Sequence, residues 1–327
     1  MKKDDVLKLL LANRGKIMSG GAMARELNVS RTAVWKMINQ LKEEGIAIGS
    51  AANEGYFINA NEDILCKGSV EMQLFDGSVL SGLDVLERVD STNSYLKQKA
   101  SQNFPDRYVV IAAEQDGGRG RMKRNFYSPK GQGVYMSVLL RPNLHISKIN
   151  FLTILSALAV YDAIYECSGV AAGIKWPNDL VFEKKKLCGI LTEAAIEGES
   201  GIVDYAIVGM GINLKQNQSD FPCEIQEVAT SVRACGGREV SRDRFSAQLI
   251  EAFFRYYDSY MKGDKLMILK VYKERLCMLH KKITVLEKNG SYTGEAIDID
   301  DEARLLVKKE NGDVAVLFAG EISIRDF

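Results

Sequence analysis

The pattern of apolar and polar positions divides the chain into three segments with different periods. In residues 1–63, apolar side chains recur at helical spacing and are followed by a short strand-like run. In residues 64–275, apolar runs typical of strands alternate with helical stretches, and in residues 276–327 apolar and polar positions alternate in short strands. The pattern therefore predicts a multidomain α+β protein with domains at 1–63, 64–275 and 276–327.

The first segment predicts three helices and a hairpin. Val6, Leu9 and Leu10 mark the first helix, and "GAMARELN" forms the second. The third helix, "RTAVWKMINQLKEEG", follows Ser30, a good N-cap, and "IAIGSAANEGYFI" predicts two short strands. This order is typical of a winged helix-turn-helix DNA-binding domain, although a three-helix protein-interaction module fits the same pattern.

The third helix supplies the candidate DNA-binding residues. Its apolar face carries Val34, Ile38 and Leu41, and the residues predicted to face DNA are Ser30, Arg31, Thr32, Trp35 and Lys36. Packing of the Trp35 ring against the wing is an equal alternative. The segment holds nine Lys/Arg and eight Asp/Glu, so one copy would bind DNA weakly and a dimer with two such helices is expected.

The second segment predicts a central mixed α/β domain with a largely antiparallel sheet. Strand-like runs occur at 108–115 and 133–140, and a helix at 151–169 ends at a glycine. Three extended stretches follow, namely "KWPNDLVF", "KLCGILTEAAIEG" and "YAIVGMGINL". The first two are joined by "EKKK", which is short enough for an antiparallel hairpin, and a further helix begins at residue 242.

The third segment predicts a small all-β, barrel-like domain. Its alternating runs are separated by turn signals at Asn289-Gly290 and Asn311-Gly312-Asp313. It contains ten Asp/Glu and seven Lys/Arg, a balance that excludes nucleic acid as its partner.

Composition narrows the class of protein. The 43 basic residues are balanced by 43 acidic ones, which argues against a protein that coats nucleic acid generally. No signal peptide and no run long enough to span a membrane are expected, so we predict a soluble cytoplasmic protein without a membrane partner. The six cysteines are scattered and only two histidines occur, which argues against a disulfide framework, a zinc site or any other fixed metal site.

The stretch "EQDGGRGRMKRNFYSP" (114–129) carries the most distinctive chemistry. A phosphate-binding loop, an RNA-binding basic segment and an idle flexible loop all compete to explain it. The Walker A sequence is absent, Lys123 stands where a Rossmann fingerprint needs glycine, and RNA-binding Arg-Gly tracts are normally repeated. Two interpretations remain, an idle loop and a loop that closes over an anionic ligand with the glycine backbone and the arginines Arg119, Arg121 and Arg124.

Five short motifs then occur in a fixed order: "RVDSTNSYL" (88–96), "GGRGR" (117–121), "KWPNDL" (175–180), "KKLCGIL" (185–191) and "GMGINL" (209–214). This set resembles the biotin protein ligase family, in particular its bifunctional members, which carry an N-terminal winged helix and act as the biotin operon repressor. The resemblance covers essentially the whole chain and implies that the C-terminal domain is an SH3-like β-barrel.

The resemblance also implies roles for individual residues. The implied biotin-binding set is Ser91, Thr92, Asn93, Gln115, Gly118, Arg119, Gly120, Arg121 and Lys186. The implied set for ATP and the adenylate is Arg119, Arg121, Arg124, Phe126, Lys175, Asn178, Gly211 and Asn213, and the implied catalytic residues are Lys186, Arg121 and Asp179. Lys123 and Phe126 stand where the family commonly has a glycine and a tryptophan, a departure that affects the nucleotide contacts of the loop.

The implied reaction uses biotin and ATP with Mg²⁺ and proceeds through biotinyl-5′-AMP, which also serves as corepressor. The implied partners are a biotin carboxyl carrier domain of acetyl-CoA or pyruvate carboxylase, operator DNA, and a second copy of the chain once the adenylate is bound. Two other classes stay open: a repressor that only senses biotin, and a ligase for a lipoyl or related acyl carrier. The charged set of Arg119, Arg121 and Lys186 argues against the first, and the "KWPND" and "GGRGR" pair with the DNA-binding unit argues against the second.

Overall fold

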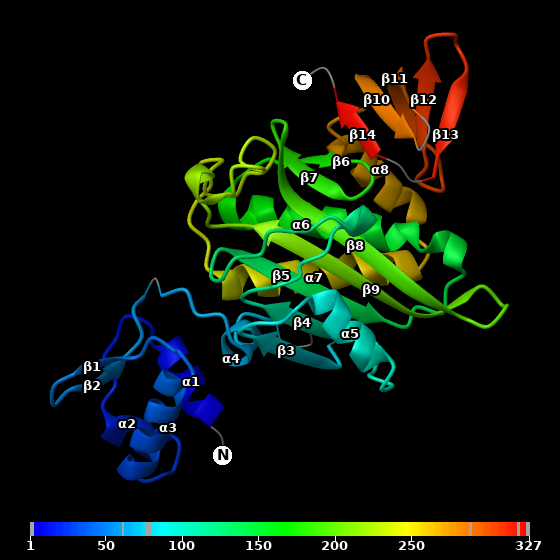
Figure 1. Cartoon of the computed structure of the whole chain (residues 1–327). Coiled ribbons are helices and arrows are strands. Elements are labelled where there is room, and N and C mark those ends of the chain that lie inside the picture. The colour runs from blue at the N-terminus through cyan, green and yellow to red at the C-terminus, as the bar shows by residue number, and fades with distance from the viewer. Residues whose placement is uncertain (1–2, 61, 76–79, 288–289, 319–320, 325–327) are drawn as a thin grey trace. The chain divides into compact units, whose positions relative to one another are not determined.

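The computed structural model describes residues 3–60, 62–75, 80–287, 290–318 and 321–324 of the chain (Figure 1). The chain forms two compact units. Unit 1 comprises Met1–Ser78 together with Ser241–Ala247, and unit 2 comprises Val79–Val240 together with Gln248–Phe327. The domain boundaries at 63 and 275 stay predictions.

Unit 1 contains the expected helices and hairpin. Its elements are α1 (Lys3–Ala12), α2 (Gly20–Glu26), α3 (Arg31–Glu43), β1 (Gly49–Ala51), β2 (Gly55–Phe57) and α4 (Lys67–Glu71). The Ser30 hydroxyl accepts a hydrogen bond from the Ala33 amide at 3.1 Å, so it caps α3 as predicted. Most apolar side chains of α1 and α3 are buried and form one core with α2, while Leu9 and Met37 are partly buried against it. The helix-turn-helix prediction is confirmed.

Unit 2 is built on a seven-stranded sheet in the order β3-β4-β5-β9-β8-β7-β6. The strands are β3 (Gly82–Leu86), β4 (Tyr108–Ala112), β5 (Gly133–Leu140), β6 (Gly173–Lys175), β7 (Asp179–Phe182), β8 (Lys185–Glu197) and β9 (Ile202–Asn213). Only β3 and β4 run parallel, and all other neighbouring pairs are antiparallel. The predicted largely antiparallel sheet is therefore confirmed, including the β7–β8 hairpin at "EKKK".

Helices cover the two faces of this sheet. Successive strand residues point to opposite faces, so neighbours on β8 show which helix lies where. Glu193 accepts a hydrogen bond from Asn93 of α5 (Thr92–Ala100), whereas the adjacent Thr192 bonds Thr153 of α6 (Asn150–Ser168). The α5 face carries the loop between β4 and β5 and the loop at residues 221–229. The α6 face is covered further by α7 (Arg242–Met261) and α8 (Lys265–Arg275), with Phe151 of α6 stacked on Tyr260 of α7 at 5.0 Å between ring centroids.

Helix α6 corrects one expectation. The sequence predicted no run long enough to span a membrane, but among the described residues the segment Ile146–Ser168 has the length and apolar composition of a membrane-spanning helix. Its 18-residue apolar window is 72% buried inside the protein. A helix that is apolar all round is typical of a protein core as well as of a membrane, and α6 lies between the sheet and the other helices.

Two strand predictions needed division. The "KWPNDLVF" stretch starts at the last residue of β6, turns at Trp176–Asn178 with a cis Trp176-Pro177 peptide, and continues as the antiparallel strand β7. The last alternating run, from residue 313, forms two strands, β13 (Val314–Leu317) and β14 (Glu321–Ile324), because Phe318 ends the first one.

The C-terminal strands form a five-stranded antiparallel sheet. Its order is β13-β12-β11-β10-β14, with β10 (Lys282–Glu287), β11 (Gly290–Ile299) and β12 (Leu305–Lys309). In the described residues the two end strands do not pair, so the structure supports a sheet and not a closed barrel. The predicted turn at Asn311-Gly312-Asp313 is present, with Gly312 at φ +90°, whereas Asn289 lies outside the described residues. Trp176 ties this sheet to the rest of unit 2 by donating its indole N–H to the Ala303 carbonyl at 2.9 Å.

Candidate active site

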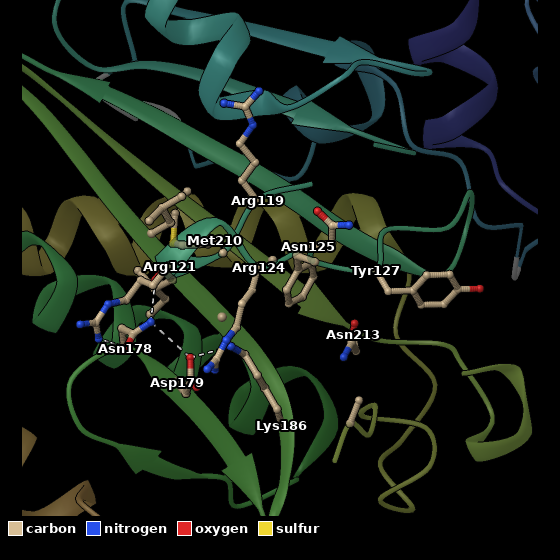
Figure 2. A pocket seen from close by; sticks show the side chains of 18 of the residues that line it. Arg119, Arg121, Arg124, Asn125, Tyr127, Asn178, Asp179, Lys186, Met210 and Asn213 are labelled. Carbon is tan, nitrogen blue, oxygen red and sulfur yellow. Dashed lines mark hydrogen bonds and ion pairs between the residues drawn. The ribbon is translucent and has the colours of Figure 1, made fainter. Parts of the chain in front are cut away.

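A cavity of about 630 Å³ opens on the α5 face of the seven-stranded sheet. It is bounded by the start of α5, the loop between β4 and β5, the β6–β7 turn, strands β8 and β9, and a second loop at residues 221–229 (Figure 2). Of the predicted biotin, adenylate and catalytic residues, all except Gly118 line it: Ser91, Thr92, Asn93, Gln115, Arg119, Gly120, Arg121, Arg124, Phe126, Lys175, Asn178, Asp179, Lys186, Gly211 and Asn213. Residues from five separate motifs therefore meet at one place.

One end of the cavity is lined by buried hydroxyl and amide groups. Ser91 is the N-cap residue of α5, yet its side chain makes no capping hydrogen bond and it lines the cavity instead. The Gln115 side-chain oxygen, Oε1, accepts from the Thr92 backbone amide at 2.9 Å and from the Thr92 hydroxyl at 3.1 Å. Groups held in this way form a rigid polar surface for a ligand that brings its own donors and acceptors.

The loop between β4 and β5 folds back on itself as a small hairpin. The Phe126 amide donates to the Gly118 carbonyl at 2.8 Å, and the Gly120 amide donates to the Arg124 carbonyl at 2.7 Å. Met122 at the tip has φ +55°. A Cβ on Gly118 would lie 2.5 Å from the Phe126 carbonyl oxygen, so only glycine allows the two arms to approach. Gly118 thus shapes the loop without lining the cavity, and the side chain of Lys123 lies outside the described part of the chain.

The other end of the cavity is strongly cationic. Lys186 on β8 pairs with Asp179 at 2.8 Å between Nζ and Oδ1. Arg121 donates from Nη1 to the Asn178 side-chain oxygen at 2.9 Å. Figure 2 shows Arg124 pointing from the loop toward Lys186 and Asp179. The structure therefore brings Arg121, Arg124 and Lys186 together at one wall.

Arg119 does not join this group. Its guanidinium pairs with Asp90 at 3.7 Å, and its side chain is 60% exposed. Figure 2 shows it directed away from Arg121 and Lys186. The three arginines of the loop thus do not form one cluster, which the spacing in the sequence could not reveal.

Phe126 covers a shelf made by two glycines. Gly189 of β8 and Gly211 of β9 are cross-strand partners on the cavity face. A Cβ on Gly211 would lie 2.6 Å from the nearest Phe126 ring carbon, and one on Gly189 would lie 3.4 Å from the ring. Two residues further along β9, the Asn213 amide donates to the Thr230 carbonyl at 3.0 Å, so this side chain is held within the protein wall.

None of the sequence motifs indicated the second loop, at residues 221–229. Phe221, Ile225, Val228 and Ala229 line the cavity, and the Phe221 ring lies 6.4 Å from that of Tyr127. This loop is bonded to the backbone of Lys186, whose amide donates to the Val228 carbonyl at 2.8 Å. The only sequence signal was a set of apolar residues in a polar stretch, which does not indicate a binding loop by itself.

Cys188 follows Lys186 on β8 but faces the core. It is completely buried, and burial raises the pKa of its thiol above the ordinary value. A thiol held in its protonated form is a poor nucleophile, so Cys188 is not a candidate nucleophile of the site. Among the described residues no three His, Cys, Asp or Glu side chains gather into a metal-binding group.

The predicted DNA-binding residues lie together on unit 1. Arg31, Thr32, Trp35 and Lys36 are exposed on α3, with the Trp35 side chain 53% exposed, so its ring does not pack fully against the wing. The Ser30 hydroxyl is used for the cap of α3. The helix therefore presents one polar face with an exposed aromatic ring.

Comparison with known proteins places this architecture. The model of the biotin/lipoate A/B protein ligase family matches residues 85–213, that of an HTH domain matches 2–57, and that of the biotin protein ligase C terminal domain matches 279–325. The bifunctional ligase/repressor BirA of Bacillus subtilis is 31% identical over 322 residues, which is 98% of each chain. The chain belongs to the biotin protein ligase family.

Further members of the family agree with this placement. BirA of Escherichia coli is 27% identical over 328 residues and 99% of each chain. The biotin protein ligase of Aquifex aeolicus, solved in complex with biotin and ATP, has a TM-score of 0.64 at 27% identity. The match covers 75% of this chain and 99% of that one.

Proposed function

We propose that this chain is a biotin protein ligase that joins biotin to a lysine of a carrier protein and also represses transcription. The observation that carries the ligase function is a single cavity with a hydroxyl and amide end at α5 and a cationic end at Lys186, closed on one side by the "GGRGR" loop. Biotin has the same polarity, since a ureido ring and a carboxylate lie at opposite ends of the molecule.

The first step forms the mixed anhydride. The polar end, with Thr92 and Gln115, binds the ureido ring and leaves the biotin carboxylate directed toward Lys186. A carboxylate oxygen attacks the α-phosphorus of MgATP, the bond to pyrophosphate breaks, and biotinyl-5′-AMP remains. Lys186, Arg121 and Arg124 stabilise the negative charge that grows on the phosphate oxygens, an effect worth about 3–4 kcal/mol per well-placed donor.

The second step transfers biotin to the carrier. The ordered loop keeps water from the anhydride. A carrier lysine attacks the biotinyl carbonyl carbon, the bond to the phosphate oxygen breaks, AMP leaves, and the amine loses a proton. We assign to Asp179 the orientation of that amine or the removal of its proton. Transfer from preformed adenylate should slow markedly in Asp179→Asn, and a normal transfer rate would remove Asp179 from the mechanism.

The nucleotide contacts follow from the same geometry. Phe126 offers a ring for an adenine face, Lys175 and Asn178 lie at the phosphate wall, and Gly211 and Asn213 lie beneath the ring of Phe126 or beyond it along β9. The carrier that enters this cavity is a biotin carboxyl carrier domain of acetyl-CoA or pyruvate carboxylase.

The repressor function rests on unit 1. The exposed face of α3 binds operator DNA, and a homodimer formed by the adenylate-bound protein presents two such helices. The dimer uses the surface that also receives the carrier, so demand for biotin sets repression. The protein is proposed to act in the cytoplasm. Its C-terminal sheet is proposed to be an SH3-like fold that is open in the described residues, and the return of the last strand, β14, to the first, β10, supports this.

Biotin- and ATP-dependent labelling of a purified carrier domain tests the ligase function. Wild type should label the carrier, and Lys186→Ala should reduce the rate about a thousandfold. Lys130→Ala is the matched control, because it removes the same charge from an exposed lysine that pairs with Glu87 at 2.6 Å and does not line the cavity.

Two other outcomes have distinct meanings. Biotin binding without labelling by wild type would favour a repressor that only senses biotin. Labelling with lipoate in preference to biotin would favour the lipoyl ligase class.

A further inference from the structure

Ser137, in the middle of β5, has no role in the function proposed above. Its side chain is 0% exposed, and its hydroxyl oxygen lies 2.7 Å from both the Thr92 hydroxyl and the Asn93 side-chain oxygen. Its cross-strand partner on β9 is Gly209, where a Cβ would lie 2.2 Å from that Asn93 oxygen. β5 therefore supplies a hydroxyl that bonds the first residues of α5, and the glycine on β9 leaves the room that the Asn93 side chain fills.

Groups that can only donate or only accept fix the direction of each hydrogen bond around Thr92. The Thr92 backbone amide can only donate, so the Gln115 atom that faces it is the oxygen. The Gln115 side-chain NH2 group then donates to the Ser128 hydroxyl at 3.0 Å. The Ser128 hydroxyl in turn donates a hydrogen bond to the Phe126 carbonyl at 3.0 Å. Because the Gln115 oxygen only accepts, the Thr92 hydroxyl donates to it. The Thr92 oxygen is left as an acceptor.

The neighbours of Asn93 fix the orientation of its side-chain amide. One atom of its side-chain amide faces the Leu191 carbonyl at 3.4 Å and the Glu193 carboxylate at 2.7 Å, and it must be the nitrogen because both neighbours are acceptors. The Asn93 oxygen therefore faces Ser137, which is the donor between the Thr92 and Asn93 oxygens. The single proton of the Ser137 hydroxyl is therefore shared between two neighbouring oxygens of the cavity wall.

We propose that Ser137 is a positioning residue for recognition of the ureido ring. This inference rests on the biotin-binding role proposed for the cavity. The two ureido N–H groups are donors and need acceptors, and both Thr92 and Asn93 line the cavity. Without the Ser137 proton, the Thr92 and Asn93 oxygens lose their shared donor while the Asn93 nitrogen stays on Glu193, so neither oxygen is held in the position that a ureido N–H needs. Ser137 itself touches no ligand, because it does not line the cavity.

Ser137→Ala in the full chain tests this inference. Biotin affinity is measured by titration calorimetry without nucleotide, and KM values for biotin and for ATP are measured in the adenylation step. The biotin Kd and the biotin KM should rise about tenfold, the cost of a misplaced hydrogen-bonding group in a buried site. The ATP KM should stay within about twofold, since no atom of Ser137 lies at the phosphate wall.

Ser156→Ala is the matched control. Ser156 is also 0% exposed, and its hydroxyl donates only within α6, to the Leu152 carbonyl at 2.6 Å. Both variants lose one buried hydroxyl, so both should lose comparable unfolding stability, and only Ser137→Ala should lose biotin affinity.

The outcomes separate the inference from the function beneath it. Equal biotin affinity in Ser137→Ala and Ser156→Ala, with wild type binding biotin, would overturn the role of Ser137 alone. Failure of wild type to bind biotin would overturn the proposed function itself. If Ser137→Ala does not fold, Ser137→Cys retains the volume with a weak S–H donor. That variant should also bind biotin more weakly than wild type, and wild-type affinity in it would refute the inference.

Discussion

The contact between Phe126 and Gly211 gives the sharpest test of the loop geometry. In Gly211→Ala the new Cβ would lie 2.6 Å from one carbon of the Phe126 ring and 2.9 Å from two others. Carbon atoms pack at roughly 3.5–4.0 Å, so the ring must retreat by about 1 Å. Overpacking of this kind lowers the free energy of unfolding by about 1–3 kcal/mol. Gly→Ala in an ordinary strand conformation raises it by about 0.4–1 kcal/mol, because alanine restricts the unfolded chain.

The two contributions leave the fold nearly as stable as before, because the Phe126 ring lines the cavity and has open space to shift into. The cost appears instead when the loop closes over nucleotide. We expect the melting temperature to change by only a few degrees and the ATP KM to rise about tenfold, which corresponds to about 1.4 kcal/mol. Steady-state release of pyrophosphate at varied ATP concentration measures this effect.

A double-mutant cycle with Phe126→Ala shows whether the ring is the cause. Once the ring is absent, Gly211→Ala should have almost no further effect on the ATP KM, so the two changes should be strongly non-additive. An equal cost of Gly211→Ala with and without the ring would refute the reasoning, because the new methyl group would then act through the strand and not through the loop.

Three further results are expected. Trp176→Phe should lower the free energy of unfolding by about 1–3 kcal/mol, since it leaves the buried carbonyl of the C-terminal sheet unpaired, and urea denaturation measures this. Burial and a hydrogen bond to Asp84 raise the pKa of Tyr95 to about 12, so its contribution to stability is present below pH 10 and is lost as the pH rises toward 12; Tyr95→Phe should lose less stability over this range in unfolding experiments at high pH. Because burial raises the pKa of Cys188, a thiol reagent at pH 8 should modify the exposed Cys223 in the native protein and reach Cys188 only after unfolding, as peptide mass spectrometry would show; native labelling of Cys188 would contradict the described burial.

Local signals explain which parts of the fold the sequence predicted. The N-cap at Ser30, the apolar stripe of α3 and the terminating Gly169 of α6 act within a few residues of themselves, and each is present in the structure. Strand β3 was missed because Asp84 and a glycine interrupt its short apolar run. The order of strands in the sheet could not be read, because β5 lies between β4 and β9, which are far apart in the chain.

The candidate site shows the same limit. The motifs named the cavity-lining residues because each motif marks a turn or a strand end, but they gave no directions for the side chains. Arg119 and Arg121 are two residues apart, but Arg119 pairs with Asp90 whereas Arg121 donates to the Asn178 side chain. Ser137 lies in an apolar strand and looks like a minor core residue until α5 is seen to lie above it. Contacts of this kind depend on the three-dimensional neighbourhood and leave no local pattern.

Charge explains why a neutral chain concentrates its basic residues at this loop. The described residues that line the cavity include six cations, Arg119, Arg121, Arg124, Lys175, Lys184 and Lys186, and one acid, Asp179. With Arg119 paired elsewhere, the wall near Lys186 still carries more positive than negative charge, which suits a phosphate group. Asp179 holds Lys186 in place in the structure, and an arriving phosphate offers that lysine a more highly charged partner. We propose that this exchange frees the Asp179 carboxylate for the role assigned to it above in transfer to the carrier lysine.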